Sequence, residues 1–255
     1  MRSFSRRQVL RTSAVGAAGA AAGGAAGVVG GRVLAQRRSP TDRVAPRPVA
    51  PGYLGARTVF QASPGSGAVA LTFDDGPGEF TPLVLDLLGE AGIPATFFLL
   101  GTNASAHPDL VAREAGAGHE VAVHGWDHQD VYSKEYDQLG DEIDRTMSAI
   151  TSAGAPAPRL WRPPYGRVDA PALMVAASRG LDVVLWGHHT PDVATAQGLV
   201  GSVGAGGIIL SHDARSQPTE ALVRAVVAAA AAVRDQGLAL VTVSELLRLD
   251  AAASS

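Results

Sequence analysis

The 255-residue chain is 46% hydrophobic and 18% charged, a balance typical of a globular protein with a sizeable core. Its 24 acidic residues outnumber 21 basic ones, which argues against a nucleic-acid partner. It has no cysteine, which excludes disulfides, a thiol nucleophile and a lipid-modified cysteine. If the chain binds a metal ion, histidines and carboxylates are therefore its expected ligands.

Residues 1–35 resemble a twin-arginine export signal. Arg6 and Arg7 form the basic pair, a weakly apolar Ala/Gly tract follows, and Val33-Leu34-Ala35 offers small residues for cleavage. The alternative is a basic N-terminus before an Ala-rich membrane helix, although glycine makes such a span poor. We expect export in the folded state to a secreted or cell-envelope location, with no stable membrane span after cleavage.

Residues 36–66 are predicted to be a proline-rich linker, because they hold five prolines and show no sustained periodicity. Residues 67–250 then form the predicted catalytic domain, in which short apolar runs alternate with helical stretches. The expected strands are Ala68–Phe73, Ala95–Leu100, Glu120–His124, Arg159–Arg162, Leu181–Trp186, Gly207–His212 and Leu238–Val243. The expected helices are Thr81–Glu90, Pro108–Ala115, Lys134–Ala153, Ala170–Arg179 and Thr219–Asp235.

This alternation predicts an α/β fold, a parallel sheet with helices outside it, closed into one barrel-like domain. Unusual polar residues follow the carboxyl ends of the strands, which is the end where α/β folds build their sites. Scattered polar residues that merely satisfy a core would have no reason to share one end. The residues concerned are Asp74, Asp75, His124, Arg162, Trp186 and His212.

Asp74 and Asp75 are adjacent carboxylates at the end of the first strand, and Gly76-Pro77 then turns the chain. Two like charges side by side repel each other and are costly to desolvate. A metal ion on one carboxylate and an arginine on the other would make the pair tolerable. An exposed Asp-Asp-Gly turn is the alternative.

His124 and His128 are four residues apart, so on a helical turn they would share one face and could bind one metal ion. Gly125 stands where the His-Glu-x-x-His protease motif has its catalytic glutamate, which makes Asp74 the candidate base. With Asp75, the two imidazoles would form a His-His-carboxylate set that leaves a position for water, as in hydrolytic zinc sites. A polar loop without a metal is the alternative.

Arg162 is followed by Pro163-Pro164-Tyr165. A guanidinium at a strand end can hold a carboxylate in a bidentate geometry. The two prolines stiffen the loop, so a backbone N–H near Tyr165 could be aimed at an oxyanion. A surface arginine before a rigid turn is the alternative.

Leu210 and His212 lie two residues apart in the expected last strand of the site and would face the same side. An apolar wall would then stand beside a proton donor. Ser211-His212-Asp213 is not a catalytic triad, because neighbouring strand residues point to opposite faces. A structural histidine is the alternative for His212.

Together and in this order, these motifs resemble those of the polysaccharide deacetylases, carbohydrate esterase family 4, whose domain is also called the NodB homology domain. The resemblance runs from about residue 67 to 247 and implies a distorted (β/α)7-type barrel with one divalent metal ion. Zinc is the expected ion, and cobalt, nickel and manganese are alternatives. The motifs that carry it are Thr72-Phe73-Asp74-Asp75-Gly76-Pro77, His124-x-x-x-His128, Arg162-Pro163-Pro164-Tyr165-Gly166 and Leu210-x-His212.

The resemblance implies a role for each matching residue. Metal ligands would be Asp75, His124 and His128. Catalysis would use Asp74 as general base, Arg162 as its tether and His212 as general acid. Substrate would be bound by Pro163, Trp186, the Tyr165 backbone N–H at the oxyanion and Leu210 at the acetyl methyl group.

The family's fourth motif usually supplies an Asp-Trp pair, and Asp192-Val193 is its nearest counterpart here. Asp192 would then orient His212. Two departures are visible, Val193 in place of tryptophan and Gly125 in place of serine or threonine. His188 and His189 match no family role.

The implied function is removal of N-acetyl groups from an N-acetylglucosamine polysaccharide, peptidoglycan or chitin-like, by attack of water. The expected partner is therefore an acetylated polysaccharide, and the protein is expected to be a monomer. One alternative is an O-acetyl esterase acting on acetylxylan, since an ester needs less help from His212. Another is a metal-bearing protein that binds cell-wall glycan with little catalysis.

Overall fold

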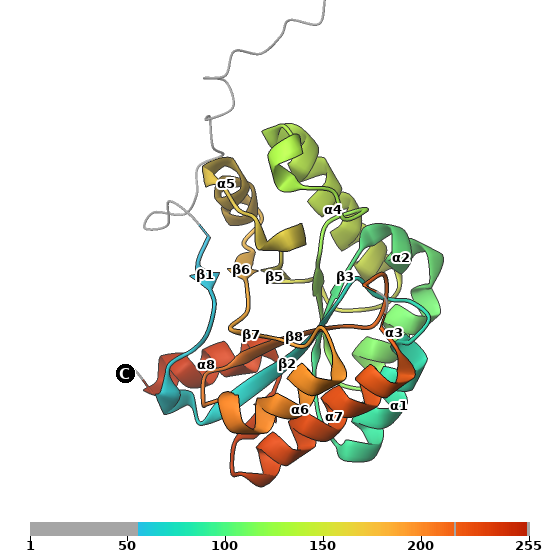
Figure 1. The fold of residues 1–255 in the computed structure, drawn as a ribbon. Helices are drawn as coiled ribbons and strands as arrows, with labels where there is room; N and C mark the ends of the chain where they lie inside the picture. The colour runs from blue at the N-terminus through green and yellow to red at the C-terminus, as the bar shows by residue number, and fades with distance from the viewer. Residues whose placement is uncertain (1–55, 217, 254–255) are drawn as a thin grey trace, which may run out of the picture. The chain divides into compact units, whose positions relative to one another are not determined.

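Strand β2 (Ala68–Asp74) lies at the centre of a single parallel sheet (Figure 1). The computed structural model describes residues 56–216 and 218–253, so the expected export signal and most of the expected linker lie outside the described residues. The sheet has nine strands within those ranges, in the order β1-β6-β5-β4-β3-β2-β8-β7, with β9 also paired to β2. The other strands are β1 (Thr58–Val59), β3 (Thr96–Leu99), β4 (Glu120–Val123), β5 (Leu160–Trp161), β6 (Asp182–Val184), β7 (His188–His189), β8 (Ile208–His212) and β9 (Ala239–Val241).

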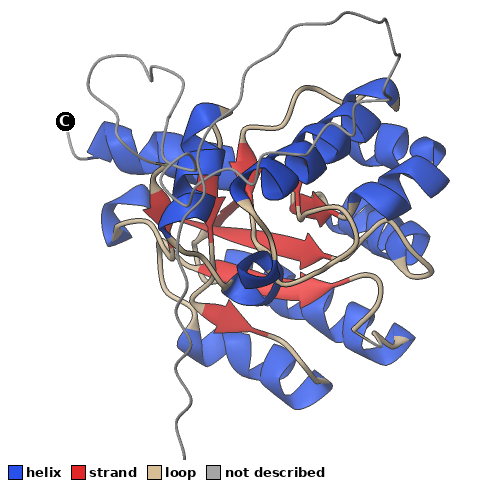
Figure 2. Ribbon diagram, turned by 90° about the horizontal axis from the view of Figure 1, so that it is seen from above, coloured by secondary structure: helices blue, strands red, loops and turns tan. Residues whose placement is uncertain are grey.

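The sheet curls, and helices surround it in the view from above, so the expected distorted α/β barrel is confirmed (Figure 2). All seven expected strands and all five expected helices are present, with ends displaced by a few residues. The helices are α1 (Thr81–Ala91), α2 (Gly101–Ala106), α3 (Pro108–Gly116), α4 (Tyr136–Ser152), α5 (Ala170–Ser178), α6 (Val193–Ser202), α7 (Glu220–Asp235) and α8 (Val243–Ala253).

Strands β1 and β7 and helices α2, α6 and α8 were not predicted from the sequence. Strands β1 and β7 have only two residues each, too few to show a period of two. Strand β1 falls within residues 36–66, the range expected to be a linker, and pairs with β6. The folded part of the chain therefore begins before residue 67.

Alternate residues of each strand face two different cores. In β2, Val69, Leu71 and Phe73 pack against the outer helices. Ala68 and Ala70 face the inside of the curled sheet, where they pack with Leu246 and Leu247 of α8. The period of two therefore directs the next inward positions, Thr72 and Asp74, into the same interior.

The side-chain patterns also explain where several helices begin. The Thr219 side chain accepts a hydrogen bond from the Leu222 N–H at the start of α7. Glu135 and Gln138 form a reciprocal capping box at the start of α4. Each arrangement satisfies backbone N–H groups that have no partner inside the helix.

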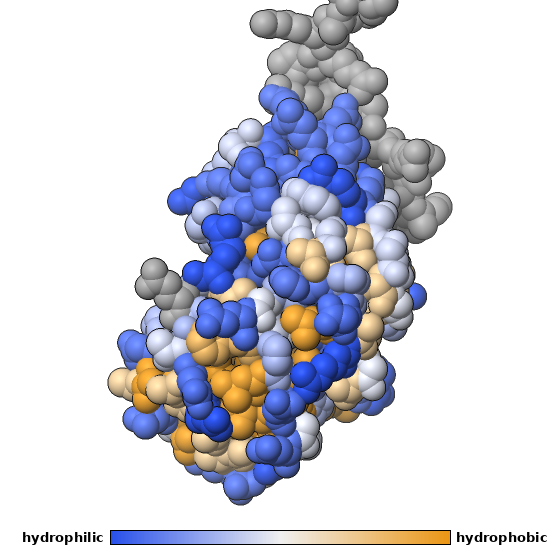
Figure 3. All heavy atoms as spheres, turned by 90° about the vertical axis from the view of Figure 1, so that its right-hand side faces the viewer, coloured by the Kyte–Doolittle hydropathy of each residue, from blue (hydrophilic) through white to orange (hydrophobic). Residues whose placement is uncertain are grey.

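The face of the molecule shown in Figure 3 carries a broad apolar area. A shallow groove between α1 and α7 is lined by Leu87, Ala91, Val227, Ala228 and Ala231, with Glu90 and Arg224 beside them. None of the helices in residues 56–216 and 218–253 combines the length and apolar character required to cross a membrane.

Candidate active site

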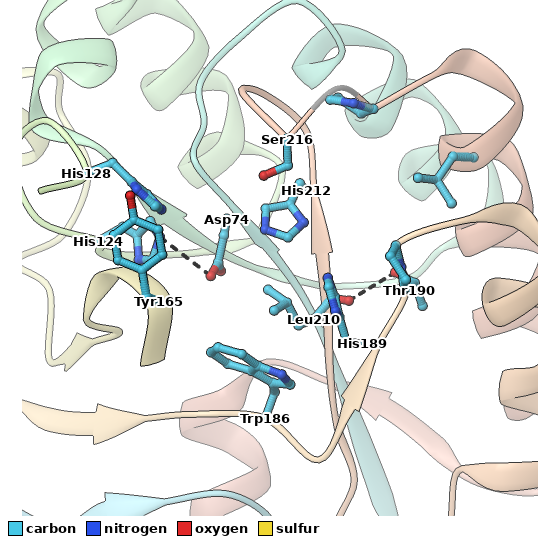
Figure 4. A pocket seen from close by; sticks show the side chains of 13 residues that line it. Asp74, His124, His128, Tyr165, Trp186, His189, Thr190, Leu210, His212 and Ser216 are labelled. Atoms are coloured by element: carbon cyan, nitrogen blue, oxygen red, sulfur yellow. Dashed lines mark hydrogen bonds and ion pairs between the residues drawn. The ribbon is translucent and has the colours of Figure 1, made fainter. Parts of the chain in front are cut away.

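A cavity of about 380 Å³ opens at the carboxyl ends of the strands (Figure 4). Its walls come from segments far apart in the sequence, as the strand-end pattern predicted. The side chains it brings together include Asp74, His124, His128, Tyr165, Leu210 and His212. Within each strand, these positions continue the inward-facing series of the barrel interior.

Asp75, His124 and His128 converge on one point. The Nε2 atoms of His124 and His128 lie 3.5 Å and 3.4 Å from Oδ1 of Asp75. Their potential ligand atoms all lie within 4.8 Å of one another. Oδ1 of Asp75 is buried and has no hydrogen-bond partner among the described residues. A buried carboxylate oxygen facing two imidazole nitrogens suits a divalent cation, so these three residues fit the expected metal ion.

A hydrogen bond to the backbone fixes the orientation of the His124 ring. Its Nδ1 lies 2.7 Å from the backbone oxygen of Arg162. Because a carbonyl oxygen can only accept a hydrogen bond, Nδ1 carries the proton and Nε2 faces Asp75 with its lone pair. This is the tautomer that a metal ligand at Nε2 requires.

The two histidines do not lie on a helical turn, contrary to the sequence-based expectation. Residues 124–128 form an irregular loop, in which Gly125 has φ of 96° and His128 has φ of 66°. Asp75 is also left-handed, with φ of 74°. Non-glycine residues in this conformation are strained and tend to occur at functional sites. The side chains of Asp75 and His128 are thus directed by left-handed backbone geometry rather than by helical spacing.

Hydrogen bonds from neighbouring elements hold this loop. The Gly125 backbone oxygen accepts from the Gly101 N–H at 3.0 Å and from the Thr146 hydroxyl at 3.0 Å. The Trp126 oxygen accepts from the Thr102 N–H at 2.9 Å. Helices α2 and α4 therefore position the segment that carries both imidazoles.

Asp74 has its own cation. Nη1 of Arg162 lies 2.6 Å from Oδ1 of Asp74, and both side chains are buried. Oδ2 of Asp74 points toward the candidate metal-binding residues, 3.7 Å from Nε2 of His124. The two adjacent carboxylates are thus partnered separately, Asp74 by Arg162 and Asp75 by the two histidines.

Every nitrogen of the Arg162 side chain has an acceptor. Besides Asp74, the guanidinium donates to the Thr72 hydroxyl at 2.7 Å and to the backbone oxygens of Val184 and Leu185 at 3.1 Å each. Its central carbon lies 4.0 Å from the centre of the Phe98 ring. A fully buried charge of this kind is stable only when paired and hydrogen-bonded throughout.

Burial and neighbouring charges oppose each other in the site. Burial would raise the pKa of Asp75, but the adjacent His124, with attraction from His128 and His212, lowers it overall. Burial would lower the pKa of His124, but Asp74 and Asp75 raise it overall. Burial lowers the pKa of His128. The negative charges of Asp74 and Asp75 thus favour a cation at this point of the site.

The expected substrate-binding residues divide into two groups. Tyr165, Trp186 and Leu210 line the cavity. Tyr165 has φ of 61°, and its ring stands 4.6 Å from that of His128 in an edge-to-face arrangement. Pro163 is buried in the loop before Tyr165 and is not part of the cavity wall.

His212 ends β8 directly beside Asp74, its register partner on β2. Burial lowers the pKa of His212; Asp74 and Asp75 act against this, whereas His189 and His124 add to it. The ring of His189 lies 5.7 Å from that of His212, inclined by 71°. His189 also lines the cavity, although no role for it was predicted from the motifs.

Asp192 is not placed where the resemblance expected it. Its carboxylate caps α6, accepting from the Thr195 N–H at 2.8 Å and the Thr195 hydroxyl at 2.9 Å. The side chain is exposed, and no hydrogen bond in residues 56–216 and 218–253 joins it to His212. Asp192 therefore starts a helix that the sequence analysis missed, and the expected contact with His212 is absent from the described part of the chain.

Two further residues donate hydrogen bonds to Asp75, although neither belongs to a recognisable sequence motif. The Ser216 hydroxyl donates to Oδ2 of Asp75 at 3.1 Å, and the Asn103 side chain donates to its backbone oxygen at 2.8 Å. Both come from segments distant in sequence, on the loop after β8 and on α2. Single polar residues of this kind carry no spacing pattern, so only the fold shows their role.

Comparisons with known proteins identify related deacetylases. A family model described as "Polysaccharide deacetylase" matches residues 61–184. Peptidoglycan-N-acetylglucosamine deacetylase PgdA of Listeria monocytogenes is 34% identical over 186 residues, which are 70% of this chain and 38% of that protein. Chitooligosaccharide deacetylase of a Bradyrhizobium species is 39% identical over 157 residues, which are 58% of this chain and 72% of that protein.

A solved structure shows the same fold. The family 4 carbohydrate esterase from Streptomyces lividans, in complex with acetate, aligns with a TM-score of 0.65 and 34% identity, covering 70% of this chain and 94% of that one. The matched region thus spans nearly the whole of this esterase structure, whereas it spans well under half of the Listeria protein.

Proposed function

The chain belongs to the polysaccharide deacetylase family, and from this premise we propose that it is a metal-dependent hydrolase that removes N-acetyl groups from an N-acetylglucosamine polysaccharide. The observation that carries the proposal is the separate pairing of the two adjacent carboxylates. Asp75 joins two histidines as a ligand set, while Asp74 is held by Arg162 with Oδ2 free toward the same cavity. A ligand set alone would fit many metalloproteins, but a tethered carboxylate beside it adds a base.

Asp75, His124 and His128 would hold the divalent ion, zinc being the expected one. When bound, the ion supplies Lewis acidity that stabilises negative charge developing on the acetyl oxygen. The Tyr165 backbone N–H, on the left-handed turn at the cavity rim, would donate to the same oxygen. Leu210 would pack against the acetyl methyl group, and Trp186 would contact the sugar.

Asp74 would serve as the base and His212 as the acid of the reaction. Oδ2 of Asp74 accepts a proton as a water oxygen bonds to the acetyl carbon. The C–N bond then breaks, and His212 donates a proton to the departing nitrogen. Acetate and a free sugar amine leave, so one acetamide and one water are consumed for each pair of products. Each positioned acid or base typically contributes ~10²–10⁴ in rate.

The relatives support the substrate class. The names of both curated relatives describe deacetylases of N-acetylglucosamine polymers, peptidoglycan in one and chitooligosaccharides in the other. We therefore place this chain's substrate among polymers of that kind. The twin-arginine pattern of residues 1–35, which lie outside the described residues, supports export to the compartment where such polymers occur.

The test is an acetate-release screen on peptidoglycan, chitin oligomers and acetylxylan, with and without chelator. We expect release from the N-acetylated polymers, loss of activity with chelator and recovery on adding zinc. Release from acetylxylan alone would instead support an O-acetyl esterase. Binding to glycan without release from any polymer would overturn the proposed hydrolysis.

A further inference from the structure

His189 shares the cavity with His212 and has no part in the reaction described above. It lies on β7, which pairs in parallel with β8 so that His189 stands opposite Leu210. The rings of His189 and His212 meet edge to face, with centroids 5.7 Å apart. In Figure 4, His189 lies beside Leu210 and His212 on the same wall of the cavity.

The orientation of the His212 ring must be held for it to act as a proton donor. A histidine at the end of a strand can turn about two side-chain torsions, and a proton donor must be aimed at its acceptor. No hydrogen bond within residues 56–216 and 218–253 reaches either ring nitrogen of His212. The carboxylate expected to orient it, Asp192, is engaged at the start of α6. The His189 ring is the aromatic neighbour that the structure gives it.

We propose that His189 is a positioning residue, whose ring holds the imidazole of His212 in the orientation from which it protonates the departing amine. This rests on the proposed function, because it takes His212 to be the general acid. The packing of one ring edge against the other ring's face restricts rotation of both, as in other edge-to-face aromatic pairs.

The neighbouring residue provides a matched control. Successive residues of a strand point to opposite sides, so His188 and His189 face different surroundings. His188 lies beside Gly207, where an added Cβ would be 3.7 Å from its Cδ2 atom, and it is not part of the cavity wall. Since His189 is exposed and His188 is half-buried on a two-residue strand, both can be replaced without opening the core.

The test compares an amide with an activated ester. An N-acetylglucosamine oligomer releases an amine that needs a proton, whereas 4-nitrophenyl acetate releases a phenolate that does not. For His189→Ala we expect kcat on the oligomer to fall about 10-fold with KM nearly unchanged, a part of the ~10²–10⁴ that a general acid contributes. Turnover of the ester and bound metal should stay at the level of the unmodified protein. His188→Ala should match the unmodified protein on both substrates.

His189→Phe separates the ring contact from the nitrogens of the imidazole. It keeps an aromatic ring against His212, so it should restore most of the kcat on the oligomer. Failure of this variant to exceed His189→Ala would overturn the proposal, as would equal losses on both substrates or no loss in His189→Ala. His212→Ala, measured in parallel, tests the general acid itself. If His212→Ala does not lose the oligomer selectively, the proposed function is wrong at that step, whatever the behaviour of His189.

Discussion

The guanidinium of Arg162 and the carboxylate of Asp74 form a buried ion pair, with Nη1 2.6 Å from Oδ1. Arg162 balances the charge of Asp74, whereas the adjacent Asp75 faces His124 and His128 instead. In a buried site, removal of one partner leaves an uncompensated charge, which is far more costly than loss of the attraction itself. Arg162 should therefore be required for folding stability as well as for activity.

Arg162→Met should lower the free energy of unfolding by about 3–5 kcal/mol, because Asp74 would remain buried without its cation. Adding Asp74→Asn should recover part of this loss, since the unpaired charge is then gone. The recovery should be partial, because the bonds from Arg162 to Val184 and Leu185 stay lost. Urea denaturation of the two single variants and the double variant measures the coupling. Strictly additive losses would show that the pair is not coupled.

Asp74→Asn and Asp75→Ala should separate chemistry from metal binding. Asp74→Asn removes the base but no ligand, so acetate release should fall ~10²–10⁴-fold while metal content stays unchanged. Asp75→Ala removes a ligand atom, so the purified variant should lose the metal itself. Elemental analysis after dialysis, together with acetate release, distinguishes the two. A fully loaded Asp75→Ala protein would show that the ligand assignment is wrong.

Strand-end positions, together with the period of two, made most of the site predictable. The carboxyl end of the first strand identified Asp74, the period of two put Leu210 and His212 on one face, and the structure puts all three in the cavity wall. Strand-end positions also identified His124 and Arg162, whose side chains meet Asp74 there. The alternation of side chains between the two faces depends only on the geometry of the strand itself, so it can be predicted from the local sequence.

Loop geometry was not predictable in the same way. The loop that carries the left-handed His128 is held by hydrogen bonds from α2 and α4 to Gly125 and Trp126, which no local pattern reports. Asp192 was read as a partner of His212, although an Asp followed by Thr195 three residues later also fits a helix N-cap. His189 was named in the sequence analysis without a role, because a two-residue strand shows no periodicity. For the loop that carries His128 and for His189, contacts distant in sequence decided the role, whereas a local contact with Thr195 decided the role of Asp192.

Gly101→Ala should weaken metal binding without touching a ligand. A Cβ at Gly101 would come within 2.6 Å of the Thr146 hydroxyl and would also clash with the Trp126 ring. The loop that carries His124 and His128 should shift, so we expect a loss of 1–3 kcal/mol in unfolding free energy, as an order-of-magnitude figure for overpacking, and weaker zinc affinity. Zinc titration by calorimetry checks the second effect.

Gly89→Ala is the matched control for that change. Gly89 lies within α1, and an added Cβ there would meet nothing within 4 Å. Alanine favours a helix interior by about 0.5–1 kcal/mol over glycine, so this variant should be slightly more stable. Its zinc affinity should equal that of the unmodified protein. Equal zinc affinity in Gly101→Ala would show that the loop tolerates displacement.

Asp213 should make stability depend on pH in a particular direction. Its side chain is fully buried, and burial raises its pKa from 3.8 to about 7, although a hydrogen bond from Thr81 acts against the shift. The unfolded chain loses this proton near pH 3.8, whereas the folded chain keeps it until about pH 7. Between these values the folded state binds more protons, so this contribution to stability is complete below pH 3.8 and is lost as pH rises through about 7.

Asp213→Asn removes this titration and keeps a polar side chain of similar size. The unfolding free energy of the unmodified protein, minus that of the variant, should fall by about 4 kcal/mol from pH 4 to pH 8. Both proteins are measured with excess chelator, so that protons competing with metal do not contribute. The pKa of Glu114 is raised by burial and also by Asp213; the burial contribution cancels between the two proteins, and the coupling to Asp213 is part of the measured difference. A difference that stays constant with pH would show that Asp213 is ionised in the folded state, and the Thr81 hydroxyl would then be donating to a buried carboxylate rather than to a neutral acid.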